Sequence, residues 1–194
     1  MKWKVPRFLI EATGHIYLHK YPMWLIYRPD IHRVRGEDVR KVLEVVEPGD
    51  ILLRRFDQYV NTLMTPGFWG HAGLFVGVND VVHSISQGCT QEDILNFCRA
   101  DAVAVLRLVG DPIPNVCEIA KALADRCVPY DYDFQADNEK FYCTELTDYL
   151  CGWAFKDDYQ MVGGNLVLTP DGMFNSDKVD VKLSINYNKE DSTC

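Results

Sequence analysis

One cysteine and two histidines have the residue types and surroundings that nucleophilic catalysis needs. Small or apolar side chains recur at helical spacing from the cysteine onward, at Cys143, Leu146, Leu150 and Trp153. This pattern predicts a helix that begins at Cys143. A thiol at a helix start faces unpaired backbone N–H groups and the positive end of the helix dipole, which lower a cysteine pKa from about 8.5 towards neutrality. Cys143 is therefore a candidate nucleophile, although a free cysteine is more often a small buried hydrophobic residue.

The two histidines lie on the two strands of a predicted β-hairpin. His71 precedes and His83 follows a turn that begins at Val78. If the turn centres on Val78, Gly73 lies opposite His83, and the two histidines point from the same face as diagonal neighbours, about 7–8 Å apart at the backbone. The glycine leaves space between them, whereas a register shift of one residue would turn one histidine to the other face.

These three residues match the parts of a thiol-based catalytic triad. Such chemistry needs a base beside the thiol and a third polar group that holds the base in the right tautomer. Two histidines and a cysteine could instead ligate zinc, but the chain has no local metal-ligand spacing and no evident fourth ligand, so we expect neither a metal nor a cofactor. A redox sensor would need a resolving cysteine, and Cys151, eight positions further along the same helix, is too far away for a direct bond.

Length and composition fit one folded domain. The chain has 194 residues, of which 47% are hydrophobic and 12% aromatic, enough for one sizeable core. No run of residues has the length of a membrane-spanning helix, and the start of the chain lacks the small-residue cleavage site of a signal peptide. Seven cysteines, an odd number without any Cys-x-x-Cys pair, indicate a reduced compartment, so we expect a cytoplasmic protein.

Charge is distributed unevenly along the chain. Residues 1–35 contain seven Lys and Arg against two Asp and Glu, a net charge of +5, which leaves −13 on the remainder because the whole chain carries −8. The acidic body argues against nucleic-acid binding, and we expect a small-molecule, peptide or acyl substrate instead. The basic, aromatic N-terminal segment could make peripheral contact with a membrane, but we favour an arm whose aromatic side chains pack on the domain.

The elements that must position the three residues follow from periodicity and turn signals. We predict a single domain over residues 1–194, with an N-terminal arm and helix (1–46), a core (47–185) and a loose tail (186–194). Helices are expected at residues 37–47, 56–64 and 143–153. Two more are expected to begin at capping pairs: one at Thr90 and Asp93, which ends at about residue 98, and one at Asn115 and Glu118, which ends at residue 127. Strands are expected at residues 51–55, 69–77, 81–85 and 102–109, with short edge elements at 166–171 and 179–185.

The order of these motifs resembles the circularly permuted papain-like fold of the NlpC superfamily, in particular its YiiX/YaeF-like group. The matching pieces are, in chain order, Pro48-Gly49-Asp50-Ile51-Leu52, His71-Ala72-Gly73-Leu74-Phe75-Val76-Gly77, Val81-Val82-His83, Pro129-Tyr130-Asp131, Tyr142-Cys143-Thr144-Glu145-Leu146 and Thr169-Pro170-Asp171. In unpermuted relatives the cysteine helix precedes the histidine strands, whereas here it follows them. The resemblance covers about residues 47–185. It implies an α+β fold in which an antiparallel sheet or small barrel packs against the helix that starts with the nucleophilic cysteine.

The resemblance implies that Cys143 is the nucleophile, His71 the general base and His83 the residue that orients His71, a place where other members of the group carry a glutamate or another polar residue. We therefore expect a cysteine hydrolase that acts on amide or peptide bonds through an acyl-enzyme, such as an amidase or peptidase of cell-wall peptides or amino-acid amides. Two alternatives stay open. One is an acyltransferase, lipid hydrolase or thioesterase similar to lecithin:retinol acyltransferase, and the other is an inert binding or structural module that keeps the fold.

The residues around the nucleophile bear on this choice. The acyltransferase relatives carry Asn-Cys-Glu-His at the nucleophile, whereas this chain has Tyr-Cys-Thr-Glu, which favours the amidase. The backbone N–H of Cys143 would be one oxyanion donor because it opens the helix. Tyr142, Gln58 and Asp50 are candidates for the oxyanion or substrate-binding wall.

Overall fold

The computed structural model describes residues 32–57, 67–111, 113–134 and 138–187, together with two short strands nearer the N-terminus. The chain divides into two units, Met1–His32 and Arg33–Cys194. In the first unit, β1 (Ile16–Leu18) and β2 (Leu25–Tyr27) pair antiparallel. Most of the predicted arm, of the predicted helix at 56–64 and of the predicted tail lies outside the described residues, and the single domain over 1–194 stays a prediction.

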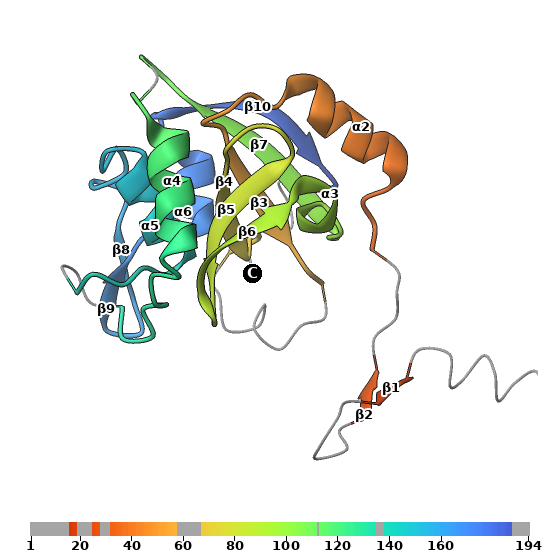
Figure 1. Cartoon of the computed structure of the whole chain (residues 1–194), viewed down its shortest axis with the longest axis horizontal. Coiled ribbons are helices and arrows are strands. Elements are labelled where there is room, and N and C mark those ends of the chain that lie inside the picture. The colour runs from red at the N-terminus through yellow and green to blue at the C-terminus, as the bar shows by residue number, and fades with distance from the viewer. Residues whose placement is uncertain are drawn as a thin grey trace, which may run out of the picture. The chain divides into compact units, whose positions relative to one another are not determined.

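The second unit is built around a six-stranded antiparallel sheet (Figure 1). Its strands lie in the spatial order β10-β7-β3-β4-β5-β6. Their bounds are β3 (Ile51–Arg55), β4 (His71–Phe75), β5 (Asp80–Ile85), β6 (Gly88–Asp93), β7 (Ala102–Leu108) and β10 (Val179–Ile185). Five of these strands, all but β6, were predicted from short apolar runs bounded by turn signals. A separate hairpin consists of β8 (Gln160–Val162) and β9 (Asn165–Val167).

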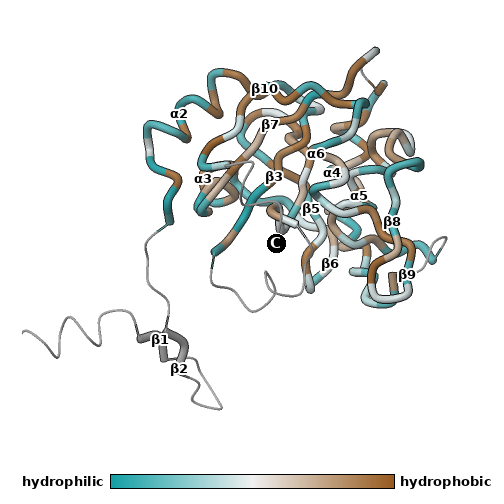
Figure 2. Tube along the Cα trace, turned by 180° about the vertical axis from the view of Figure 1, so that it is seen from behind, coloured by the Kyte–Doolittle hydropathy of each residue, from teal (hydrophilic) through white to brown (hydrophobic). Residues whose placement is uncertain are grey.

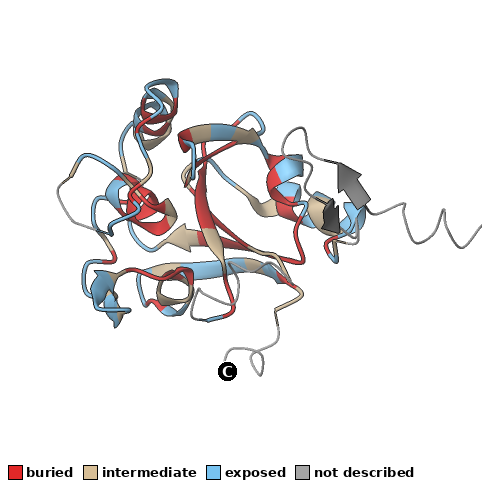
Figure 3. Cartoon of the chain, turned by 90° about the horizontal axis from the view of Figure 1, so that it is seen from below, coloured by how far each residue is buried: buried red, intermediate tan, exposed pale blue. Residues whose placement is uncertain are grey.

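Helices cover both faces of this sheet. They are α2 (Gly36–Val45), α3 (Ile94–Phe97), α4 (Val116–Asp125), α5 (Cys143–Leu150) and α6 (Pro170–Asn175). Alternate residues of β3 define the two faces, because Ile51 and Leu53 pack with α4, α5 and α6, whereas Leu52 packs with α2 and α3. Hydrophobic residues run along β7 and the first half of β3 (Figure 2), and buried residues gather on the central strands (Figure 3). The fold is therefore α+β with an antiparallel sheet, as predicted.

The first half of the predicted helix after Thr90 is instead a strand, and only residues 94–97 are helical. Residues 88–93 form β6 and pair with β5, and α3 begins only after Asp93, whose Oδ1 accepts the Leu95 N–H at 2.8 Å. Gly88 has a φ of +105°, which lets the chain reverse tightly before this strand. The Thr90 and Asp93 capping pair was therefore a wrong interpretation of residues that belong to a hairpin.

Two other helices differ from the prediction at their ends. α4 begins at Val116 as expected, but Asn115 has a left-handed conformation with φ 57° and makes no side-chain cap, so no capping box forms there. α5 ends at Leu150 instead of continuing to Trp153, because Gly152 and Trp153 have φ values of +66° and +59°. Among the helices that the structure describes, none has both the length and the apolar composition to cross a bilayer.

Candidate active site

Cys143 is the first residue of α5, as the sequence predicted. Tyr142 is the N-cap residue, with extended backbone angles, and its N–H donates to the Glu145 carboxylate at 3.4 Å. Further along the helix, Leu146 and Leu150 are buried in the core shared with α4 and α6, which fixes the helix against the sheet. The sulfur of Cys143 accepts backbone N–H groups from three residues: Ala72, Thr144 and Cys143 itself. Because Ala72 follows His71 on β4, the thiol reaches this strand beside the histidine.

The charge state of the thiol differs from the prediction. Burial raises the pKa of Cys143, and this effect outweighs the three N–H groups and the Arg54 guanidinium, all of which lower it. The predicted lowering of the pKa by the helix start was therefore wrong in direction, because the sequence pattern did not reveal how far the sulfur is desolvated. The resting group is a neutral thiol, so nucleophilic attack requires a base that removes its proton.

The two histidines form a direct contact. β4 and β5 pair Leu74 with Val82 and Phe75 with Val81, and this register sets Gly73 opposite His83 as predicted. Nε2 of His71 lies 2.8 Å from Nδ1 of His83, and the two rings are nearly perpendicular at 82°. A Cβ atom at Gly73 would lie 3.1 Å from Cβ of His83, so the glycine provides the space that the second histidine occupies.

Both imidazoles are neutral at physiological pH. Burial, with smaller contributions from Arg54 and His83, lowers the pKa of His71 well below 6.5. Burial, followed by Arg54, lowers the pKa of His83 to about 3. A neutral imidazole has one donor and one acceptor nitrogen. A single proton therefore lies between the two rings, and His71 can accept another only if its remaining nitrogen, Nδ1, is free of one.

Two charged residues that were not among the predicted site residues, Arg54 and Glu92, complete this cluster. Arg54 pairs with His71 in the register of β3 and β4. Its guanidinium donates to Oε2 of Glu92 at 2.8 Å and stacks 4.3 Å from the Phe97 ring. The same Oε2 lies 3.4 Å from Nε2 of His83. A signal for Arg54 was present, since an arginine at an inward position of the apolar strand Ile51–Arg55 needs a buried partner. Glu92 was hidden because its strand had been interpreted as a helix start.

The structure describes two of the three predicted wall residues, Tyr142 and Asp50. The Tyr142 side chain is buried, and its phenol oxygen accepts the Leu168 N–H at 3.2 Å, which is a structural role. Asp50 precedes β3 at the end opposite Arg54, four residues or about 13 Å away along an extended strand. Gln58 lies outside the described residues. Tyr130 lies close to the thiol, since Cys143 contributes, after burial, to raising the pKa of its phenol. Cys143 also contributes, after burial, to raising the pKa of Tyr142.

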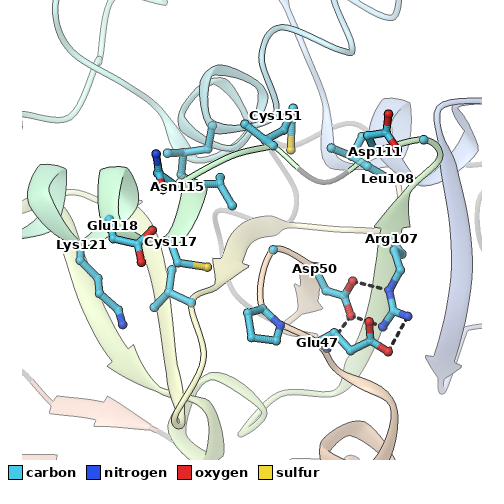
Figure 4. Close-up of a pocket in the computed structure, with 17 residues that line it drawn as sticks. Glu47, Asp50, Arg107, Leu108, Asp111, Asn115, Cys117, Glu118, Lys121 and Cys151 are labelled. Carbon is cyan, nitrogen blue, oxygen red and sulfur yellow. Dashed lines mark hydrogen bonds and ion pairs between the residues drawn. The ribbon is translucent and has the colours of Figure 1, made fainter.

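Asp50 belongs to a separate pocket of about 430 Å³ on the α4 side of the sheet (Figure 4). Both of its carboxylate oxygens accept hydrogen bonds from Arg107 at 2.8 Å, and Glu47 pairs with the same guanidinium at 2.8 Å. The thiols of Cys117 and Cys151 also face this pocket. Neither Cys143 nor the two histidines line it.

Comparison with known proteins identifies the family of the chain. Residues 45–184 match the family described as permuted papain-like amidase enzymes, the YaeF/YiiX or C92 family, and the chain belongs to this family. It is therefore a thiol-dependent hydrolase of the cysteine peptidase and amidase class. A crystal structure described as that of "metalloprotein yiiX" from Escherichia coli O157:H7 has the same fold, with a TM-score of 0.52 and 16% sequence identity over 72% of this chain and 97% of that chain. No curated protein matches the sequence.

Proposed function

We propose that this protein hydrolyses amide bonds of peptides or amino-acid amides, with Cys143 as nucleophile, His71 as general base and His83 as the residue that orients His71. The observation that carries the proposal is the 2.8 Å contact between Nε2 of His71 and Nδ1 of His83. It leaves Nδ1 as the free ring nitrogen of the base. The hydrogen bond from the Ala72 N–H to the sulfur supports a thiol that lies next to this base.

The pKa directions favour attack from a neutral pair over a preformed ion pair. In the first step, the proton of Cys143 moves to Nδ1 of His71 while the sulfur bonds to the substrate carbonyl carbon. The backbone N–H of Cys143 would donate to the resulting oxyanion. His71 then returns its proton to the leaving amine as the C–N bond breaks. Water, deprotonated by His71, finally hydrolyses the thioester and restores the thiol.

A metal-dependent reaction has less support from the residues. The structurally similar YiiX protein is described as a metalloprotein. In residues 32–57, 67–111, 113–134 and 138–187, no group of three or more His, Cys, Asp or Glu side chains is arranged to hold a metal ion. Two nitrogens on one tetrahedral zinc, each at about 2.0–2.1 Å, would lie about 3.3 Å apart. The 2.8 Å contact between His71 and His83 is that of a hydrogen bond instead.

Trapping of the acyl-enzyme tests the proposal. The protein would be incubated with aminoacyl p-nitroanilides and with p-nitrophenyl acetate, quenched in acid, and analysed by intact-mass and peptide mass spectrometry. We expect one acyl group on Cys143, no adduct in Cys143→Ala, and acylation about 10²- to 10⁴-fold slower in His71→Ala. Cys127→Ala is the matched control, because Cys127 is an exposed free thiol outside the proposed triad.

Two outcomes decide between the remaining hypotheses. Acylation of Cys127 alone, or a rate at Cys143 that does not depend on His71, would contradict the proposed roles. Faster release of the acyl group by added amines or alcohols than by water would favour the acyltransferase alternative. No contact among the described residues favours that alternative at present.

The cytoplasmic location stays a prediction.

A further inference from the structure

The cluster around His71 extends two residues beyond the proposed triad. Starting from His71, the polar groups follow one another as His71, His83, Glu92 and Arg54, and the Cys143 thiol meets the backbone of Ala72, next to His71. The Phe97 ring lies 5.7 Å from the His83 ring and 4.3 Å from the Arg54 guanidinium, so this chain of contacts is shielded by an aromatic side chain. Arg54 is only 10% exposed and Glu92 28% exposed. A partly buried ion pair still carries a desolvation cost, which calls for a reason why it lies here.

The neighbours of His83 determine where its proton lies. Its Nε2 is buried and has no hydrogen bond that meets strict geometry, but the Glu92 carboxylate oxygen lies 3.4 Å away. A carboxylate stabilises a proton on the nearest ring nitrogen and repels a lone pair there. His83 therefore carries its proton on Nε2, and its Nδ1 must accept. The proton between the two rings then belongs to Nε2 of His71.

We propose that Glu92, held in place by Arg54, is a positioning residue that fixes the tautomers of both histidines, so that Nδ1 of His71 is free to accept the thiol proton. Part of this inference rests on the proposed function, because it assigns Nδ1 to the thiol. The proton transferred from Cys143 stops at His71. Glu92 keeps its negative charge throughout and exchanges no proton.

Arg54 explains why the carboxylate orients His83 without charging it. A lone carboxylate near an imidazole favours the imidazolium, which would place a second proton on the ring that is needed as an acceptor. The guanidinium bound to the same Oε2 offsets this effect. Burial lowers the pKa of His83 to about 3, and the positive charge of Arg54 contributes to this lowering. The pair thus selects a tautomer while its net charge stays zero.

Nitrogen NMR measures the tautomers directly, without any substrate. Long-range ¹H–¹⁵N spectra of the ¹⁵N-histidine-labelled protein at pH 7, assigned with His71→Asn and His83→Asn, separate protonated from unprotonated ring nitrogens. We expect protons on Nε2 of both rings. In Glu92→Met, which removes the acceptor at similar size, we expect both rings to gain the Nδ1-protonated form together, because they share one proton. Glu92→Gln keeps an oxygen but loses the charge, and an intermediate mixture is expected.

Acylation of Cys143 provides the second readout. Glu92→Met is expected to slow it about 10- to 100-fold, the usual range for a residue that orients a functional histidine from behind. Gln91→Met is the matched control, since Gln91 is the exposed neighbour on the same strand and faces the other way. Because Glu92→Met leaves Arg54 unpaired, the double variant Arg54→Met with Glu92→Met is measured as well. It carries no unpaired buried charge and is expected to show the same mixed tautomers.

The two readouts separate the two proposals. Protons on Nδ1 of His71 or His83 in the unchanged protein, or tautomers that stay the same in Glu92→Met and in the double variant, would overturn the role of Glu92. Tautomers as expected together with no acylation of Cys143 would uphold that role and refute the proposed hydrolase mechanism. A loss of thermal stability with unchanged tautomers and unchanged acylation would mean that Glu92 and Arg54 are merely structural, and would also overturn the inference.

Discussion

Gly73→Ala tests whether the space beside the two histidines matters for the reaction. The new Cβ would lie 2.8 Å from Cγ1 of Val81, 3.1 Å from Cβ of His83 and 3.2 Å from Cε2 of Phe97. Carbon atoms pack at about 3.5–4.0 Å, so Val81 must move by about 0.7 Å or more, and His83 and Phe97 by a few tenths of an ångström. Gly73 does not have a positive φ, so the backbone accepts an alanine and the effect is purely one of crowding.

The crowding acts on the histidine pair. A shift of Cβ carries the whole His83 ring with it, and a displacement of about 0.4 Å stretches the 2.8 Å contact with His71 to the limit of a good hydrogen bond, about 3.2 Å. Overpacking of a core costs about 1–3 kcal/mol of stability. Misplacement of a catalytic group by about 1 Å costs about 100-fold in rate. We therefore expect Gly73→Ala to be about 1–3 kcal/mol less stable and about 10- to 100-fold slower in acylation of Cys143.

The matched control is Gly70→Ala, one residue before β4. A Cβ there meets only the Arg54 carbonyl oxygen, at 3.9 Å, which is an ordinary contact. Urea unfolding gives the stability of each variant, and mass spectrometry gives the acylation rate of the folded protein. If Gly73→Ala acylates within about twofold of the unchanged protein, while Gly70→Ala does the same, the geometry of the pair does not limit the reaction and the reasoning is refuted.

Three further predictions concern pH, the segment before β4 and the second pocket. Burial raises the pKa of Cys143 and lowers that of His71, so the pair keeps its one transferable proton over a wide range of pH. We therefore expect kcat/KM to stay level from well below pH 6.5 to above pH 9. A narrow bell-shaped pH profile of kcat/KM would contradict the neutral pair. Asp171→Ala removes the carboxylate that accepts the Trp69 N–H at 2.8 Å and should cost about 1–3 kcal/mol in urea unfolding, and an unchanged midpoint would show that water replaces it. Arg107→Leu removes the ion-pair partner of the buried Asp50 carboxylate and should lower the free energy of unfolding by about 3 kcal/mol, with acylation of Cys143 unaffected. This value is near the low end for a buried pair because Arg107 is 30% exposed. A loss of stability below about 1 kcal/mol would argue that the pair is solvated.

The parts of the site that could be predicted are those encoded by neighbouring residues. Helical spacing after Cys143 located the start of α5, and a tight turn at Val78 fixed the register that brings His71 and His83 together. The direction of the thiol pKa could not be predicted, because it depends on burial by elements distant in the sequence.

The role of Glu92 was missed for the same reason. Its contact with Arg54 joins residues 38 positions apart and exists only because β6 and β3 belong to one sheet. A local pattern of polar residues at Thr90 and Asp93 gave a different, helical interpretation of the same stretch. Sequence patterns therefore located the cysteine and the two histidines, whereas their charged neighbours Arg54 and Glu92 became visible only in three dimensions.

The neutral state of the Cys143 thiol affects how fast this side chain is oxidised under oxidative stress. Peroxides attack thiolates, so a cysteine whose pKa is raised by burial oxidises slowly. A cysteine enzyme with a permanent thiolate is exposed to this reaction at all times. Here the nucleophile would be generated only when substrate is bound, and the exposed Cys127 should react with hydrogen peroxide before Cys143 does. Mass spectrometry of sulfenic and sulfinic acids at increasing peroxide doses would measure this order, and oxidation of Cys143 first would show that its thiolate is already present at rest.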